Sequence, residues 1–216
     1  MSKQVEPSTP AQDGHTSNRF FANYYERTSN NREEEHFMKP LRKEVTGLAR
    51  GRVLEIGAGN GLNFAFYHPE TTTQVEAIEP DGPMLGYARQ RAEAASVPIN
   101  LVQAPVEKLP FDDESFDSVV ATLVFCSVND PQRGLSEVRR VLKPGGALLM
   151  VEHVRAKGAI VATLQHIITP ITRRLTGNCH WDRDTAKTVA EAGFKIEQRR
   201  DITRFMLPLV VLHAMK

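Results

Sequence analysis

The sequence has little of the chemistry that defines several broad classes of protein. Its 216 residues include only two cysteines, Cys126 and Cys179, and these do not form a CxxC pair. This count argues against a disulfide framework and a structural zinc site, and it predicts a reducing compartment, the cytoplasm. No run of about 18 apolar residues occurs, so we expect no membrane-spanning helix.

The chain also lacks an excess of charge of either sign. Lys and Arg total 27, Asp and Glu total 26, and the formal net charge is +1. Binding to nucleic acid or acidic lipid depends on clustered positive charge, so this balance favours neither partner. We therefore expect a small-molecule ligand and no nucleic acid, and the sequence leaves the oligomeric state open.

Few apolar residues occur at the start of the chain. Residues 1–18 are rich in Ser, Thr, Pro and Gln, and they predict a disordered tail with neither a signal peptide nor a membrane anchor. The remainder, 19–216, is predicted to be a single domain. Its first part, 19–50, is aromatic and then helical in spacing, and we expect it to form an N-terminal helical lid.

From residue 52 onward, strand-like and helix-like segments alternate. This alternation predicts an α/β fold, a Rossmann-like seven-stranded and mostly parallel sheet with helices on both faces. Asp81 or Gly82 and Asp130 are expected to begin two of the helices. The predicted strands are 52–56, 73–80, 99–104, 115–125, 147–154, 194–200 and 205–214, and the predicted helices are 61–68, 83–95, 131–142, 158–176 and 182–192.

Three glycines lie within five residues in the stretch VLEIGAGNG, at Gly57, Gly59 and Gly61. A strand, a bare glycine turn and a helix together point backbone amides at a ligand. Glu79 closes the next predicted strand, 22 residues after Gly57, close to the spacing at which a carboxylate meets ribose hydroxyls. The spacing GxGxG differs from the GxGxxG of dinucleotide-binding turns, which argues against a nicotinamide-dependent oxidoreductase.

Five blocks in this order resemble the class I S-adenosylmethionine-dependent methyltransferases, with a methyltransferase type 11 domain. The blocks are VLEIGAGNG, AIEPD, PMLGYAR, LPFDDESFDSVVA and LSEVRRVLKPGGALLM. The resemblance extends from about Tyr24 to Val154 and more weakly to the end. It implies S-adenosylmethionine as the cofactor and transfer of its methyl group to a small molecule.

A closer likeness is to the small thiol S-methyltransferases of the methyltransferase-like seven group. It rests on NGLNFAFYHP, TLVFCSVNDPQR, MVEHV and GNCHWDRDT. It implies a thiol acceptor, although those proteins begin with a hydrophobic anchor that this sequence lacks. Transfer to oxygen, nitrogen or carbon of a natural-product or quinone-like acceptor stays open, and so does a non-catalytic, cofactor-binding role.

The resemblance implies specific cofactor contacts. In S-adenosylmethionine, the methionine part would lie beside the glycine turn, and the ribose hydroxyls would bind the acid at the end of the next strand. The loop at 104–107 would contact the edge of the adenine. Pro105 stands where many family members carry an acid, and Glu107 is the substitute that we expect. The implied cofactor residues are Glu55, Gly57, Ala58, Gly59, Gly61, Glu79, Pro80, Met84, Val106, Glu107 and Leu123.

The acceptor side is predicted at the ends of the fourth and fifth strands and in the Cys179-His180-Trp181 loop. His153 and His180 are the candidate catalytic bases, and no metal ligands are expected. Tyr24, Tyr25, Cys126 and Trp181 are the candidate substrate contacts. Each has a structural alternative, since free cysteine packs like a hydrophobic residue and His153 could satisfy a buried carboxylate. Ile160, Leu164, Ile167 and Ile168 recur at helical spacing, as the underside of a covering helix or as a pocket wall.

Overall fold

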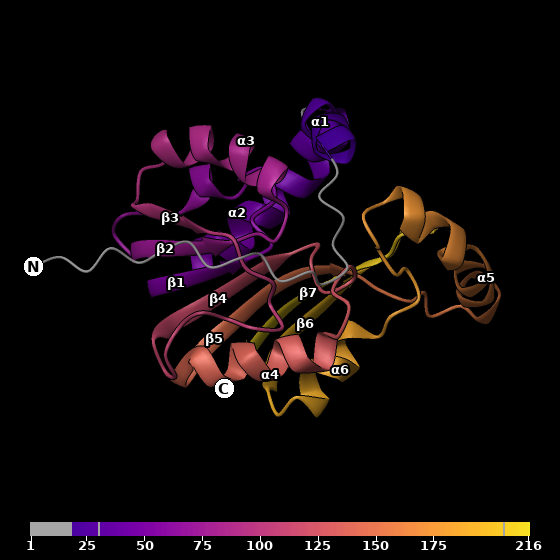
Figure 1. Cartoon of the computed structure of the whole chain (residues 1–216). Helices are drawn as coiled ribbons and strands as arrows, with labels where there is room; N and C mark the ends of the chain where they lie inside the picture. Colours follow the sequence, from indigo (N-terminus) through magenta and orange to yellow (C-terminus); the bar gives the residue numbers. More distant parts are fainter. Residues whose placement is uncertain (1–18, 30, 205) are drawn as a thin grey trace, which may run out of the picture.

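The computed structural model describes residues 19–29, 31–204 and 206–216; the tail predicted for residues 1–18 lies outside them. One seven-stranded sheet forms the centre, in the order β3-β2-β1-β4-β5-β7-β6 (Figure 1). The first five strands in this order are parallel, and β7 is antiparallel to both of its neighbours. The strands are β1 (Gly51–Ile56), β2 (Thr72–Ile78), β3 (Ile99–Val102), β4 (Phe116–Thr122), β5 (Leu142–His153), β6 (Lys195–Ile202) and β7 (Leu209–Met215). The predicted fold class is confirmed.

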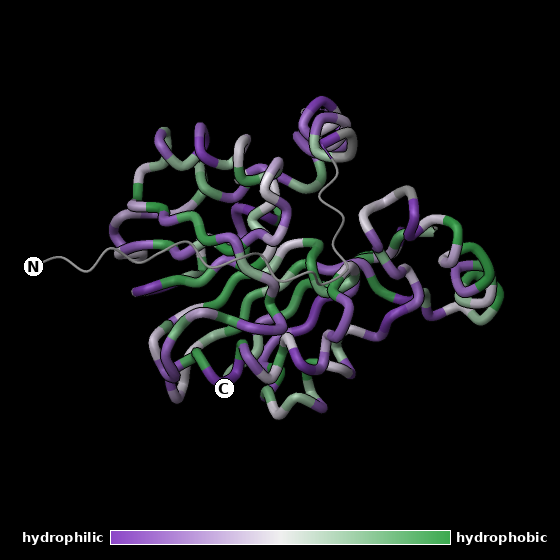
Figure 2. The backbone as a smooth tube through the Cα atoms, viewed as in Figure 1, coloured by the Kyte–Doolittle hydropathy of each residue, from purple (hydrophilic) through white to green (hydrophobic). Residues whose placement is uncertain are grey.

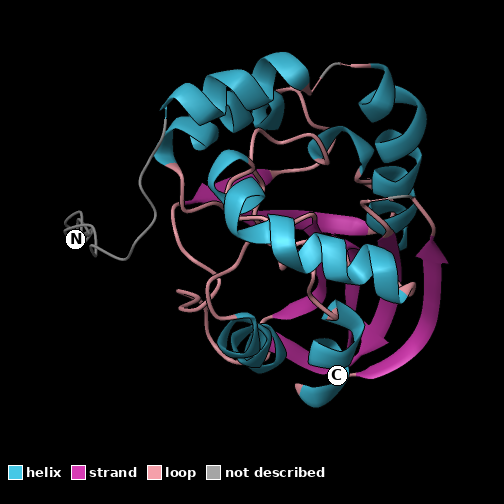
Figure 3. Cartoon of the chain, turned by 90° about the vertical axis from the view of Figure 1, so that its right-hand side faces the viewer, coloured by secondary structure: helices cyan, strands magenta, loops and turns pink. Residues whose placement is uncertain are grey.

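Helices cover both faces of the sheet because the central strands are apolar on both sides (Figures 1 and 3). Neighbouring residues of β1 divide between the two layers: Val53 packs with α2 and α3, and Leu54 packs with α4 and α6. Figure 2 shows the hydrophobic segments concentrated in these strands. The helices are α1 (Arg19–Thr28), α2 (Lys39–Leu48), α3 (Gly82–Glu93), α4 (Pro131–Val141), α5 (Ala159–Leu175) and α6 (Thr185–Glu191), with a π-helical turn η1 (Glu34–Met38).

Aspartates begin three of the helices. Asp81 accepts a hydrogen bond from the Met84 amide at the start of α3, and Asp130 accepts one from the Arg133 amide at the start of α4. Asp184 caps α6 in the same way. Satisfying these first-turn amides is what an N-cap aspartate contributes, so the predicted starts at Asp81 and Asp130 are confirmed.

Several predicted element boundaries are wrong; the last strand, predicted at 205–214, begins at Leu209, and the fourth strand, predicted at 115–125, ends at Thr122. Residues 61–68 form only a short 3-10 turn, η2 (Phe64–Phe66), rather than a helix. The strand predicted at 147–154 begins earlier, at Leu142, because the Pro-Gly-Gly segment continues into β5.

The helix α5 lies beyond the carboxyl end of β5, on the right in Figure 1. Its inward face is Ala162, Gln165 and Thr169, and the Gln165 amide group donates to the carbonyls of Val154 and Met206. Three of the four residues expected to face inward, Ile160, Leu164 and Ile167, are instead exposed, and Ile168 is half-buried. The inward assignment of Ile160, Leu164 and Ile167 is therefore wrong, because polar anchoring decides which face of α5 is buried. Within the described part of the chain, no helix has the length and apolar character needed to cross a membrane.

Candidate functional site

The glycine turn follows β1 with all three glycines at positive φ: +62° at Gly57, +56° at Gly59 and +85° at Gly61. Each has a different surrounding. A Cβ atom on Gly57 would lie 2.7 Å from a Val124 methyl group, and one on Gly61 would lie 2.7 Å from the Phe64 ring. A Cβ on Gly59 would meet nothing within 4 Å. Gly57 and Gly61 are therefore required by packing, whereas Gly59 borders open space suited to a ligand.

The Glu79 carboxylate lies directly against this turn. Its two oxygens accept hydrogen bonds from the amides of Gly59, at 2.9 Å, and Asp81, at 3.0 Å. Burial raises the pKa of the carboxyl to about 7, although both hydrogen bonds act to lower it. Each carboxylate oxygen has two lone pairs, so Glu79 retains acceptor capacity after both amides are satisfied.

The remaining candidates around β2 and α3 are mostly buried. Met84 is 6% exposed and Val106 is 4% exposed, and both follow the carboxyl ends of neighbouring strands. The Pro80 carbonyl accepts a hydrogen bond from the Gln103 side chain. Glu107 accepts a hydrogen bond from the Asp130 amide, which ties its loop to the start of α4.

Glu55, at the end of β1 just before the turn, is buried. Its carboxylate accepts hydrogen bonds from the Tyr67 hydroxyl, at 2.7 Å, and from the Asn63 amide group, at 3.2 Å. Burial raises the pKa of Glu55 to about 7 against the opposing effects of Tyr67 and Arg42. Arg42 in turn donates to Asn63, so these groups form one buried polar network under the turn. Ala58, between the first two glycines, donates its amide to the Ile78 carbonyl.

The N-terminal helix is tied to the glycine turn by side-chain hydrogen bonds. Asn60, within the turn, donates to Glu26 at 2.6 Å, and Arg91 of α3 pairs with the same carboxylate. Tyr25 lies in the field of Arg42 and Glu79, and burial raises its pKa. Tyr24 is 59% exposed, whereas Tyr25 is half-buried.

The loop after β4 is held by a single buried carboxylate. Glu152 of β5 accepts hydrogen bonds from the amides of three consecutive residues, Val124, Phe125 and Cys126. Leu123, just before them, has a φ of +59° and donates its amide to the Val151 carbonyl. Such a backbone conformation costs energy in a non-glycine residue and is found where surrounding contacts enforce it.

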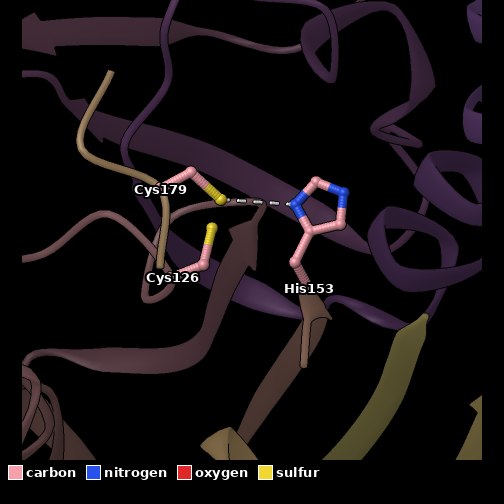
Figure 4. Close-up of side chains that lie close together, drawn as sticks. All are labelled: Cys126, His153 and Cys179. Atoms are coloured by element: carbon pink, nitrogen blue, oxygen red, sulfur yellow. Dashed lines mark hydrogen bonds between the residues drawn. The ribbon is translucent and has the colours of Figure 1, made fainter. Parts of the chain in front are cut away.

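Cys126, His153 and Cys179 come together at the carboxyl ends of β4 and β5 (Figure 4). Their ligand-type atoms all lie within 4.8 Å of one another, and Sγ of Cys179 is 3.6 Å from Nδ1 of His153. The Cys179 thiol and burial raise the pKa of Cys126. Burial lowers the pKa of His153, but Cys126 and Glu152 outweigh it and the net shift is upward.

The loop at 178–183 packs against the loop after β4. The His180 amide donates to the Cys126 carbonyl at 2.7 Å, and Arg183 donates to the carbonyls of Phe125 and Val128. The imidazole of His180 lies outside the cluster, and burial lowers its pKa. Trp181 follows it and is partly exposed.

Comparison with known proteins agrees with this architecture. A family described as "Methyltransferase domain" matches residues 54–150. The thiol S-methyltransferase TMT1B of Homo sapiens is 36% identical over 172 residues, which cover 76% of this chain and 70% of that protein. The chain belongs to the class I S-adenosylmethionine-dependent methyltransferases.

Other relatives of this methyltransferase differ in their named acceptors. TMT1B of Rattus norvegicus is 34% identical over 73% of this chain, and the match spans 63% of the rat protein. The ubiquinone/menaquinone biosynthesis C-methyltransferase UbiE of Geotalea daltonii is 30% identical over 74% of this chain and 77% of its own length. The structure of a possible histamine N-methyltransferase from Thermotoga maritima superposes with a TM-score of 0.66 at 24% identity, covering 92% of this chain and 97% of its own.

The residues of the methyltransferase fit the cofactor that the family implies. Gly59 leaves open space at the turn, Glu79 presents a carboxylate with free acceptor capacity, and Met84 and Val106 supply apolar surface. A pocket of about 580 Å³ lies elsewhere, on the far side of Gly61 toward Arg32 and Arg91, and Glu79 does not line it. The contacts of the glycine turn, Glu79, Met84 and Val106 with the cofactor therefore stay predictions, as do those of Glu55, Pro80, Glu107 and Leu123.

The sequence did not reveal two features of the methyltransferase. One is the Glu152 carboxylate that fixes the loop after β4. The other is that Cys126, His153 and Cys179, all from segments expected on the acceptor side, bring their ligand-type atoms within 4.8 Å of one another. His153 lies 27 positions after Cys126 and Cys179 lies 26 positions after His153, so no short motif links the three residues. The signal available was topological: all three follow the carboxyl ends of strands or lie in the loop beside them.

Proposed function

We propose that this methyltransferase transfers a methyl group from S-adenosylmethionine to the sulfur of a small thiol by direct displacement. The observation that carries the proposal is the sulfur and imidazole cluster of Cys126, His153 and Cys179 at the strand ends next to the glycine turn. The identity of 34–36% to proteins named thiol S-methyltransferases supports the same acceptor.

The residues of the chain align the methyl group of the cofactor with the acceptor sulfur. When bound, S-adenosylmethionine supplies an electrophilic methyl group on a sulfonium. Glu79 and Gly59 hold the cofactor side, and the loop after β4, fixed by Glu152, holds the acceptor side. Because Val124 of that loop packs directly against Gly57, the two sides are joined without intervening layers. Fixing both partners in line is the main contribution required for a displacement reaction.

Ionisation of the acceptor is the second requirement, since the thiolate is the nucleophile. His153 is the imidazole nearest to sulfur in the cluster, and we assign it the role of favouring the acceptor thiolate. The side chain of His180 lies outside the cluster, so we assign it a smaller contribution to ionisation of the acceptor thiol.

A panel of acceptors tests the proposal. Purified protein is incubated with methyl-labelled S-adenosylmethionine and aliphatic thiols, phenols, amines or a demethylated quinone, and the labelled product is identified by mass spectrometry. Thioether formation from thiols is the expected result. The relationship to UbiE makes carbon methylation of the quinone the second candidate. Turnover of the quinone with none of the thiols would replace the proposal by that candidate.

A further inference from the structure

The cluster of Cys126, His153 and Cys179 has the composition and spacing of a metal site. In tetrahedral zinc sites the Zn–S bond is about 2.3 Å and the Zn–N bond is about 2.1 Å, so adjacent S and N ligands lie about 3.6 Å apart. The Cys179 Sγ to His153 Nδ1 distance is 3.6 Å, and all three ligand atoms lie within 4.8 Å of one another. Ligand pairs of one zinc ion lie about 3.6–3.8 Å apart, so a pair nearer to 4.8 Å would have to close by rotation of its side chains.

We propose that Cys126, His153 and Cys179 bind one zinc ion, whose fourth position takes the sulfur of the acceptor thiol. The second half of this proposal rests on the proposed function. Two thiolates and a neutral imidazole around Zn²⁺ have no net charge, which suits a cluster in which both cysteines are at most 6% exposed. Sites with two cysteines, one histidine and an open fourth position occur among catalytic zinc centres.

The ligands are held in place by contacts outside the cluster. Glu152 accepts the amide of Cys126, and the Cys126 carbonyl accepts the amide of His180, the residue after Cys179. The hydroxyl of Ser127 lies 3.7 Å from Sγ of Cys126, within reach as a donor to a thiolate. Such supporting hydrogen bonds orient metal ligands and are a regular part of metal sites.

The chemistry of the bound acceptor balances without an oxidant or reductant. The acceptor thiol loses its proton to solvent as its sulfur binds zinc. Its sulfur then forms a bond to the methyl carbon while the bond from that carbon to the sulfonium breaks. The electron pair of the broken bond remains on the cofactor sulfur, which becomes a neutral thioether, and zinc keeps its oxidation state.

Metal analysis of the purified protein, prepared without chelators, tests the site. We expect about one zinc per chain, and in the cobalt-substituted protein the charge-transfer and visible bands of thiolate-bound tetrahedral cobalt. Cys179→Ser and His153→Gln should each lower zinc affinity at least about 100-fold, more than is usual for the loss of a supporting contact. The matched control is His166→Gln, which changes a histidine on α5 that pairs with Asp182, and it should retain the metal. Circular dichroism and calorimetric cofactor binding show whether each variant is folded.

Each contrary result has a defined meaning. Wild-type protein that neither contains nor takes up zinc overturns the metal site, and so does equal loss of zinc in His166→Gln. Thiol methylation by metal-free protein would overturn the inference while leaving the proposed function intact. If zinc is bound but the cobalt spectrum does not change when the acceptor thiol is added, the fourth-position assignment is wrong.

Discussion

The backbone amide of Gly59 donates a 2.9 Å hydrogen bond to the Glu79 carboxylate, joining the turn after β1 to the end of β2. The two residues are 20 positions apart, and the parallel pairing of β1 with β2 brings them together. This hydrogen bond fixes the positions of the amide and the carboxylate relative to each other. Groups that are fixed in this way lower the ordering cost of ligand binding.

A methyl group at Gly59 should interfere with the cofactor while leaving the fold intact. The space beside Gly59 is open, so Gly59→Ala pays only the cost of a positive φ, about 1–2 kcal/mol. We expect its dissociation constant for S-adenosylmethionine to rise at least about tenfold, or 1.4 kcal/mol. Gly145→Ala is the matched control, because Gly145 also has a positive φ and open surroundings. The dissociation constants are measured by calorimetry. Equal affinity of Gly59→Ala and Gly145→Ala for S-adenosylmethionine would rule out Gly59 as a cofactor residue.

Gly57 should behave differently, because its neighbour is protein. A Cβ there would lie 2.7 Å from Val124, so Gly57→Ala forces the loop after β4 to move. We expect a loss of about 1–3 kcal/mol in the free energy of unfolding, typical of overpacking, in addition to the strain of the positive φ. Denaturant titration measures it, and wild-type stability would contradict the packing account.

Cofactor binding should weaken as the pH falls below about 7. Burial raises the pKa of the Glu79 carboxyl from 4.5 to about 7. The contribution of this carboxyl to the free energy of folding is therefore favourable below pH 4.5 and is lost as the pH rises through 7. The ionised form is the better acceptor for ribose hydroxyls. The dissociation constant should therefore rise by up to about tenfold per pH unit below 7.

Two variants separate the carboxylates responsible for this pH dependence. Glu79→Gln should bind the cofactor about 1–3 kcal/mol more weakly and lose most of the dependence on pH. Glu55→Gln changes a buried carboxyl whose pKa is also about 7 but whose partners are Tyr67 and Asn63. Glu55→Gln should retain the pH dependence of the cofactor dissociation constant. If Glu55→Gln loses this dependence and Glu79→Gln retains it, the cofactor contact belongs to Glu55.

The N-terminal segment should act as a lid through Glu26 and Tyr25. Deletion of residues 1–15 should leave methyl transfer intact, whereas deletion of 1–30 removes α1 together with the contacts to Asn60 and Arg91. We expect the longer truncation to lose turnover while circular dichroism still reports a folded core. Full turnover by the longer truncation would exclude a lid.

The two candidate histidines should differ in their effect on turnover. His153→Gln should lower kcat/KM for a thiol much more than cofactor affinity, and His180→Gln should have the smaller effect, because its imidazole lies outside the cluster. A loss in His153→Gln that shrinks above about pH 8.5, where a thiol ionises unaided, would indicate that His153 acts as a base. A loss that persists at high pH is the expected result if His153 binds the proposed zinc ion. Equal and wild-type turnover in both variants at neutral pH would show that no imidazole is needed.

Much of the fold was predictable because its signals are local. The alternation of apolar runs with amphipathic segments gave the parallel sheet, and Asp81 and Asp130 marked helix starts through contacts three residues along the chain. The exposed face of α5 was not predictable, because Gln165 buries the opposite side through bonds to Val154 and Met206. Tertiary hydrogen bonding, which periodicity does not report, decided that orientation.

Part of the arrangement at the candidate site was also predictable. The spacing of Gly59 and Glu79 predicted two groups at one edge of the sheet, because successive parallel strands end there, and their 2.9 Å hydrogen bond shows that they are neighbours. Their contact with the cofactor stays a prediction. From the sequence we expect Cys126, His153 and the loop that holds Cys179 on one acceptor side, and their cluster confirms that these segments meet. No metal ligands are expected from the sequence, because no short motif joins the three residues, so the zinc site proposed above rests on the structure.

The most direct test of thiol methylation compares an alkyl thiol with the alcohol of the same carbon skeleton. The two acceptors differ only in sulfur against oxygen, so shape and hydrophobic binding are matched. Methyl transfer from labelled S-adenosylmethionine is measured for both at neutral pH, with His153→Gln in parallel. The account predicts a thioether product from the thiol, none from the alcohol, and a marked loss in the variant. Methylation of the alcohol at an equal or higher rate would contradict it.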